Sequence, residues 1–121
     1  MSDKQFRFED LEIWRRGAEI SGKLFQLADE LEKRHLFRFA EQLRGATLSI
    51  TNNIAEGSGS LSNAEFANFL NMSRRSIFET ANILTVLSKN GYVPADAIQP
   101  LLVELEEQSR MILAFHRTLK S

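Results

Sequence analysis

The sequence predicts an all-α protein, an antiparallel up-and-down four-helix bundle. Three observations support this prediction. Apolar residues recur every three or four positions through four long runs, as they do on core-facing helices. Gly and Pro, which interrupt helices, are rare, with six Gly and two Pro in the chain. No stretch alternates apolar and polar residues as a half-buried strand does. Helices joined by short loops pack antiparallel in such bundles, and we expect residues 1–121 to form a single domain.

The first predicted helix covers about residues 10–33. Asp10 is expected to cap its N-terminus, because an Asp side chain accepts hydrogen bonds from the free N–H groups of a first turn. The polar stretch 32–35 breaks the apolar pattern and is predicted to be the first connection. The core-facing residues are spaced by three and four: Leu11, Trp14, Ala18, Ser21, Phe25 and Ala28. Further apolar residues broaden this stripe: Ile13, Ile20, Leu24, Leu27 and Leu31.

The second predicted helix covers about residues 36–58. It ends at the Gly-Ser-Gly-Ser sequence of residues 57–60, where a glycine can occupy the position after the last helical residue. One face of this helix is apolar: Leu36, Phe39, Leu43, Ala46, Ile50 and Ile54.

The third predicted helix covers about residues 63–89. Ser62 and Glu65 have the spacing of a capping box, in which each side chain bonds to the backbone of the other residue. The helix should end at Asn90-Gly91. Its predicted core residues are Phe66, Phe69, Leu70, Ile77, Ala81, Leu84 and Leu87.

The fourth predicted helix begins after Val93-Pro94. Pro100 lies early in this run, so it either kinks the first turn or marks the true start, with residues 94–98 as a separate turn. Gln108 is the one interruption of a heptad seam whose apolar members are Ile98, Leu101, Leu105, Ile112, Phe115 and Leu119.

The composition excludes several classes of function. Fifteen Lys and Arg against sixteen Asp and Glu give a net charge of −1, which differs from a strongly basic nucleic-acid-binding protein. The chain has no Cys and two His, so thiol chemistry and cysteine zinc sites are excluded. Glu32 and His35 have a di-iron spacing, but they lie in a predicted loop and lack a second such pair. We expect no catalytic, cofactor or metal site. The charged N-terminal sequence and the lack of a long apolar run predict a cytoplasmic protein without a membrane segment.

A polar stripe lies beside the apolar face of the second helix. Ser49, Asn52, Asn53 and Glu56 are spaced by three and four, so they share one side. This stripe either recognises a partner or forms a hydrogen-bond network that fixes helix register. A Glu near a helix C-terminus is unfavourable with the macrodipole. We therefore expect Glu56 to bond to the start of the third helix or to an Arg, such as Arg74, of a neighbouring chain. The Asn53 amide is likewise expected to bond to the backbone at the turn between the second and third helices, or across a subunit boundary.

Arg44 and Glu79 are expected to form an ion pair. If the second and third helices are antiparallel about the turn at residues 58–61, these residues lie at nearly the same height. The offset is about 6 Å at 1.5 Å per residue, which an Arg side chain can span.

Some large apolar residues lie off the main stripes. A helix of a monomeric bundle buries one face, so a second apolar face indicates association. The alternative is that these residues lie at the edges of a broad core. They are Phe6, Phe8, Phe78, Ile83 and Val86.

Positive charge is concentrated in the middle of the chain. Lys33, Arg34 and Arg38 lie around the first predicted connection and could contact phosphates. The alternative is an ordinary solvated loop.

Several motifs together resemble the 23S rRNA intervening-sequence protein family. Residues 6–14, with the Asp-Leu-Glu-Ile-Trp sequence of 10–14, resemble the family's opening Phe-x-Asp-Leu-x-Val-Trp. Residues 49–57, Ser-Ile-Thr-Asn-Asn-Ile-Ala-Glu-Gly, resemble its signature Ser-Ile-Pro-Ser-Asn-Ile-Ala-Glu-Gly. Further matches follow in order: Phe66-x-x-Phe69-Leu70, Arg74-x-Ser76-x-x-Glu79, Gly91-Tyr92 and Arg110-Met111-Ile112.

The resemblance implies a four-helix bundle that assembles into a homo-oligomer, a ring-like homopentamer in family members. Proteins of this family are encoded within intervening sequences of large-subunit rRNA genes. Relatives accompany the reverse transcriptase of diversity-generating retroelements, bind nucleic acid and are markedly basic. The leading hypothesis is therefore a non-enzymatic homo-oligomeric scaffold or adaptor. The alternative is an RNA- or DNA-binding accessory protein that acts with rRNA or a reverse transcriptase.

Overall fold

The computed structural model describes residues 5–119 and confirms the all-α four-helix bundle. Four long helices follow a short 3-10 helix, and their bounds lie within a few residues of the predicted ones. The elements are η1 (Arg7–Asp10), α1 (Glu12–Lys33), α2 (Phe37–Ser58), α3 (Asn63–Lys89) and α4 (Ala95–Arg117).

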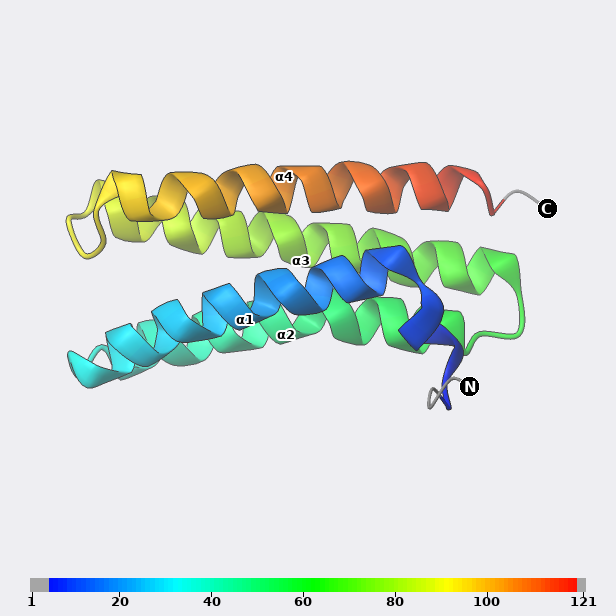
Figure 1. The fold of residues 1–121 in the computed structure, drawn as a ribbon, viewed down its shortest axis with the longest axis horizontal. Helices are drawn as coiled ribbons and strands as arrows, with labels where there is room; N and C mark the ends of the chain where they lie inside the picture. The colour runs from blue at the N-terminus through cyan, green and yellow to red at the C-terminus, as the bar shows by residue number, and fades with distance from the viewer. Residues whose placement is uncertain (1–4, 120–121) are drawn as a thin grey trace.

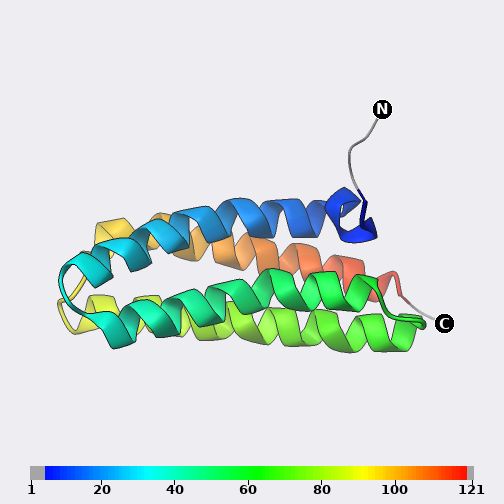
Figure 2. The same ribbon diagram turned by 90° about the horizontal axis from the view of Figure 1, so that it is seen from below.

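The helices run up and down along one long axis (Figures 1 and 2). The α1–α2 and α3–α4 turns lie at one end of the bundle, and the α2–α3 turn lies at the other end (Figure 1). Each helix packs on the helix before it and the helix after it, and α4 closes the ring against α1. The four predicted apolar stripes therefore meet along one central core.

The core is filled mainly by leucine and isoleucine side chains that are almost completely buried. Polar side chains are also buried in it. Gln108 of α4 donates from Nε2 to the carbonyl oxygen of Ile13 in α1, at 2.7 Å. Gly17 makes room for this contact, because a Cβ there would lie 3.2 Å from Gln108 Nε2. Gln108, which interrupts the apolar seam of α4, thus links α4 to α1. Large core residues include Leu24, Leu43, Ile54, Leu70, Leu84, Leu105 and Ile112.

The two turns at one end of the bundle have the same backbone design. Leu36 N donates to Leu31 O, and Tyr92 N donates to Leu87 O, so both α1 and α3 end in a Schellman motif. The motif places one residue in the left-handed region, where Gly91 has φ 80° and His35 has φ 62°. A residue with a side chain is strained in this region. The His at residue 35 therefore gave no sign of the left-handed conformation in the sequence.

Two details of the helix ends differ from the sequence prediction. Asp10 is the last residue of η1, and Leu11 occupies the N-cap of α1 without a side-chain cap, so the predicted Asp10 cap is wrong. The 3-10 turn moves the N-cap of α1 one residue beyond Asp10, to Leu11. Pro100 lies inside a continuous α4 that begins after Pro94, so it does not mark the start of that helix. Ser62 caps α3 as predicted, with its Oγ accepting from Glu65 N at 3.1 Å.

Candidate assembly surface

The polar stripe of α2 borders a groove between α2 and α3. The groove has a volume of about 450 Å³, and Ser49 and Asn53 line it on the α2 side. Asn52 and Glu56 are exposed on α2 outside this lining. On the α3 side it is lined by Met72, Arg75, Ser76 and Glu79.

The uncharged polar side chains of the groove bond to one another, whereas its Arg75 and Glu79 do not take part. Asn53 Nδ2 donates to Ser49 O at 2.8 Å and to Ser49 Oγ at 3.1 Å. Ser76 Oγ donates to the same Ser49 Oγ at 2.9 Å and ties α3 to α2. This arrangement agrees with the register-fixing interpretation of the stripe. The Asn53 amide bonds along its own helix, however, and not at the α2–α3 turn.

Glu56 does not make the contact expected at that turn. Its side chain is exposed, and it has no hydrogen bond or ion pair with any residue in the described part of the chain. The free N–H of Glu65 at the start of α3 is already satisfied by Ser62. The other half of the expectation, an Arg of a neighbouring chain, stays a prediction.

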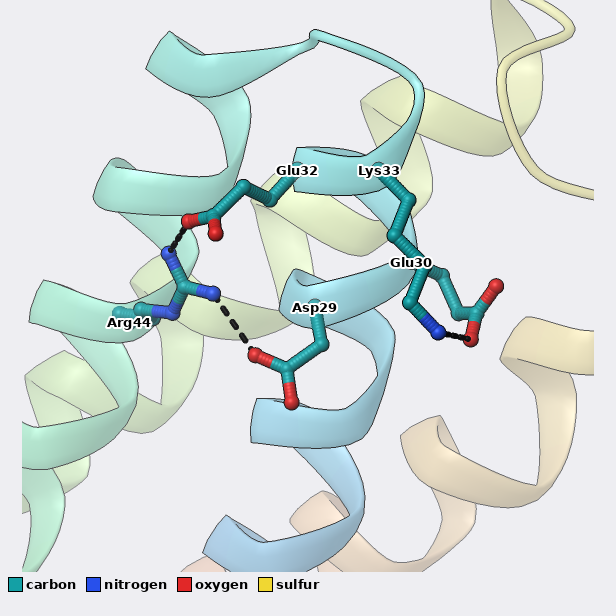
Figure 3. Close-up of polar contacts among 5 residues, drawn as sticks. All are labelled: Asp29, Glu30, Glu32, Lys33 and Arg44. Carbon is teal, nitrogen blue, oxygen red and sulfur yellow. Dashed lines mark hydrogen bonds and ion pairs between the residues drawn. The ribbon is translucent and has the colours of Figure 1, made fainter.

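The expected Arg44–Glu79 pair is wrong. Arg44 donates to Asp29 and to Glu32 of α1, in each case at 2.7 Å (Figure 3). These hydrogen bonds raise the pKa of the Arg44 guanidinium above its ordinary value, and the bond to Asp29 has a larger effect than the bond to Glu32. The error in this prediction concerns the direction in which Arg44 points, and not its height along α2. Arg44 lies five residues before Ser49, about 140° around the helix at 100° per residue, so it faces α1 and not α3.

We expect Arg44→Ala to lower the melting temperature only slightly, by about 1–4 °C. Both carboxylates are more than half exposed and the Arg44 side chain is 32% exposed, so water screens the pairs. The loss should shrink further in high salt. Arg38→Ala is the matched control, because Arg38 lies on the same helix without an ion pair among the described residues. A large loss for Arg44→Ala at both salt concentrations would contradict this view.

Two of the three cations around the α1–α2 turn are used within the chain. Lys33 pairs with Glu30 on α1 (Figure 3). Arg34 donates to the carbonyl oxygen of Tyr92 and so ties the first turn to the third. Arg38 is exposed and has no such partner within residues 5–119. The patch therefore has a structural role at the end of the bundle where α1 and α3 finish.

The residues expected on a second apolar face divide into two groups. Phe8 packs on Trp14 with ring centroids 4.9 Å apart, and Ile83 packs against the core, so these two lie at its edge. Phe6, Phe78 and Val86 are exposed. Exposed large apolar side chains occur before η1, along α2 and α3 and in two turns, whereas α4 has one and α1 has none. They are Phe6, Phe37, Leu48, Leu61, Met72, Phe78, Val86, Tyr92 and Val103.

The ion pairs have the opposite distribution. Within residues 5–119, every ion pair joins side chains of α1, α2 and α4, and none includes α3. Arg74 of α3 donates to Ser109 of α4. The remaining charged residues of α3 are exposed without a partner in the described structure: Glu65, Arg75, Glu79 and Lys89. The outer side of α3 thus combines exposed apolar residues with unpaired charges, a feature that the sequence hid because pairing depends on the neighbours of each helix.

The comparisons with known proteins agree with this architecture. The family model for the 23S rRNA-intervening sequence protein matches residues 9–114. The chain belongs to this family. It is also similar to the crystal structure of a protein of unknown function from the S23 ribosomal protein family of Bacteroides thetaiotaomicron. That likeness has a TM-score of 0.81 and 21% identity and covers 86% of this chain and 97% of the other, which shows a shared fold. No curated protein matches the chain.

Neither the family nor this structural neighbour indicates an enzyme. Within the described residues, no three His, Asp or Glu side chains gather in a way that could hold a metal ion. No helix between residues 5 and 119 is long and apolar enough to cross a membrane.

Proposed function

We propose that this family member is a non-enzymatic scaffold that works as a homo-oligomer. The observation that supports the proposal is the outer side of α3. Phe78 is 64% exposed and Val86 is 48% exposed there, beside four charged residues that have no partner among residues 5–119. Burying such apolar area between copies contributes about 25 cal/mol per Å², and the charges can then pair across the contact.

The mass of the protein in solution tests this proposal. At micromolar concentration, light scattering should give a multiple of the 13.8 kDa chain mass. The family resemblance implies five copies, so about 69 kDa is the expected value for a ring-like pentamer. A mass of one chain would overturn the proposal.

The alternative is an accessory protein that binds RNA or DNA together with rRNA or a reverse transcriptase. Arg38 favours it, because this exposed cation is not used within the described structure. Against it, Lys33 and Arg34 already have partners in the chain. In a gel-shift measurement, binding that weakens steeply between low and physiological salt would favour this alternative. Unchanged migration at low salt would leave the scaffold as the better account.

A further inference from the structure

The outer face of α3 carries positive charge and contains a hollow. Its members lie within about 80° of one another around the helix, at 100° per residue: Arg75, Phe78, Val86 and Lys89. Arg75 and Lys89 have no ion pair or hydrogen bond among the described residues. The hollow has a volume of about 310 Å³, and its lining includes two guanidinium groups and an aromatic ring: Asn71, Arg74, Arg75 and Phe78.

The outer face of α4 offers side chains that complement those of α3. Asp96, Val103 and Glu106 also lie within about 80° around their helix. Val103 is 48% exposed. Asp96 has no partner within residues 5–119, and Glu106 has an exposed i, i+4 pair with Arg110, which contributes little to stability. Two carboxylates and one large apolar side chain of α4 are therefore available for a contact.

We propose that the outer face of α4 in one copy packs on the outer face of α3 in the next copy, head to tail around a ring. This proposal rests on the proposed homo-oligomer and assigns the surfaces that form it. A contact between two different faces closes into a ring when the rotation between copies divides a full turn. Adjacent helices of a four-helix bundle face outward about 90° apart, near the roughly 108° between the contact faces of a regular five-membered ring.

Contacts within one copy show which residues of α3 and α4 lie at the same height. Phe66 packs on Phe115 with ring centroids 5.4 Å apart, and Arg74 donates to Ser109 at 3.3 Å. Because the helices are antiparallel, residues 75 and 78 of α3 are level with about residues 107 and 104 of α4. Rotation about an axis parallel to the helices does not displace one copy along that axis. The same heights therefore meet between copies.

This register places a carboxylate at the hollow of α3. Glu106 is within about one residue of the height of Arg75, a difference of about 1.5 Å. Its carboxylate therefore enters the hollow between Arg74 and Arg75, where charge-assisted hydrogen bonds can form. Arg110 of the same α4 face is nearly level with Asn71, which is uncharged. The hollow on α3 thus receives a group of opposite charge.

The remaining side chains of the two faces also match. Val103 is within about one residue of the height of Phe78, so these two exposed apolar side chains cover each other. Lys89 lies about 5 Å from the height of Asp96, a distance that a lysine side chain spans. Both unpaired cations of the α3 face thus gain a carboxylate partner. Such complementary charges determine the register of an interface.

The outer face of α2 is a less suitable partner for α3. The hydrogen bonds between α2 and α3 within one copy show which of their residues are level. At these heights the charged residues of α3 nearest to Glu41 and Glu56 of α2 are Glu79 and Glu65. A ring built on α2 and α3 would therefore bring like charges together. Such repulsion excludes the wrong surface from an interface.

Charge reversal tests the contact in the full-length protein. Arg75→Glu puts a carboxylate against the next copy's Glu106, so the dissociation constant should rise by about 100-fold or more, because like charges are then apposed. In the double variant R75E/E106R the signs are exchanged, the opposite charges meet again, and association should return. Glu41→Arg is the matched control, because Glu41 is exposed on α2 and has no ion pair within residues 5–119.

Mass measurements over a dilution series separate the outcomes. Loss of association in R75E with recovery in R75E/E106R, and no change in E41R, supports the contact between α3 and α4. Loss without recovery overturns it, as does loss in E41R. Unchanged association in R75E also overturns it, while the proposed homo-oligomer stands. A wild-type protein with the mass of one chain overturns both. Circular dichroism melting of each variant confirms that the bundle is folded.

Discussion

Phe66→Ala is expected to lower the free energy of unfolding by about 3–5 kcal/mol, because it removes a large side chain from a packed interior. Phe66 is 2% exposed and packs against the Phe115 ring, with centroids 5.4 Å apart. The Arg7 guanidinium lies 5.2 Å from the Phe66 ring centre, so the same substitution removes a cation–π contact. This one side chain therefore joins α3, α4 and the segment before α1.

Denaturant unfolding measures this loss. A fall in the transition midpoint without a change in slope shows that stability changed and not the compactness of the unfolded state. Leu61→Ala is the control, because Leu61 is 99% exposed and its removal should change stability by less than about 0.5 kcal/mol. Similar small effects for both variants would show that Phe66 is not a centre of the packing.

Gly57→Ala is expected to lower the free energy of unfolding by about 1–2 kcal/mol, which is the upper part of the usual overpacking cost of about 1–3 kcal/mol less a gain in helix propensity of about 1 kcal/mol. A Cβ at residue 57 would lie 2.7 Å from Phe69 Cβ and 2.8 Å from Phe66 Cδ1. Phe69 Cβ is fixed to the backbone of α3, so the helices themselves must separate. The clash outweighs the gain in helix propensity, which is about 1 kcal/mol for Gly→Ala.

Gly45→Ala provides a control of opposite sign on the same helix. A Cβ at Gly45 has no neighbour within 4 Å and Gly45 is exposed, so only the propensity gain remains. This variant should be more stable than wild type by about 0.5–1 kcal/mol. If Gly57→Ala were also stabilising, the close approach of α2 and α3 at this point would be wrong. The close approach of α2 and α3 thus explains why the motif of residues 49–57 ends in a glycine.

The sequence determined the helices and their order. Periodicity locates a buried face on each helix, and Ser62 and Gly91 indicate where helices begin and end, because these signals depend on residues close in the chain. The sequence also identified Phe78 and Val86 as surplus apolar residues, since a residue off the main stripe is recognised from spacing alone. It did not identify His35 as a left-handed residue, because the geometry there follows from the turn and not from the side chain.

Only the tertiary structure decided which helix each polar side chain meets. Arg44 was assigned to the wrong neighbour, since its height along α2 does not say in which direction around the helix axis it points, and it points to α1 and not to α3. The same dependence hid two further features: α3 forms no ion pair within residues 5–119, and the role of Gly57 is set by atoms of another helix. Spacing along one chain segment determines which residues share a face, whereas the packing of all four helices determines what that face contacts.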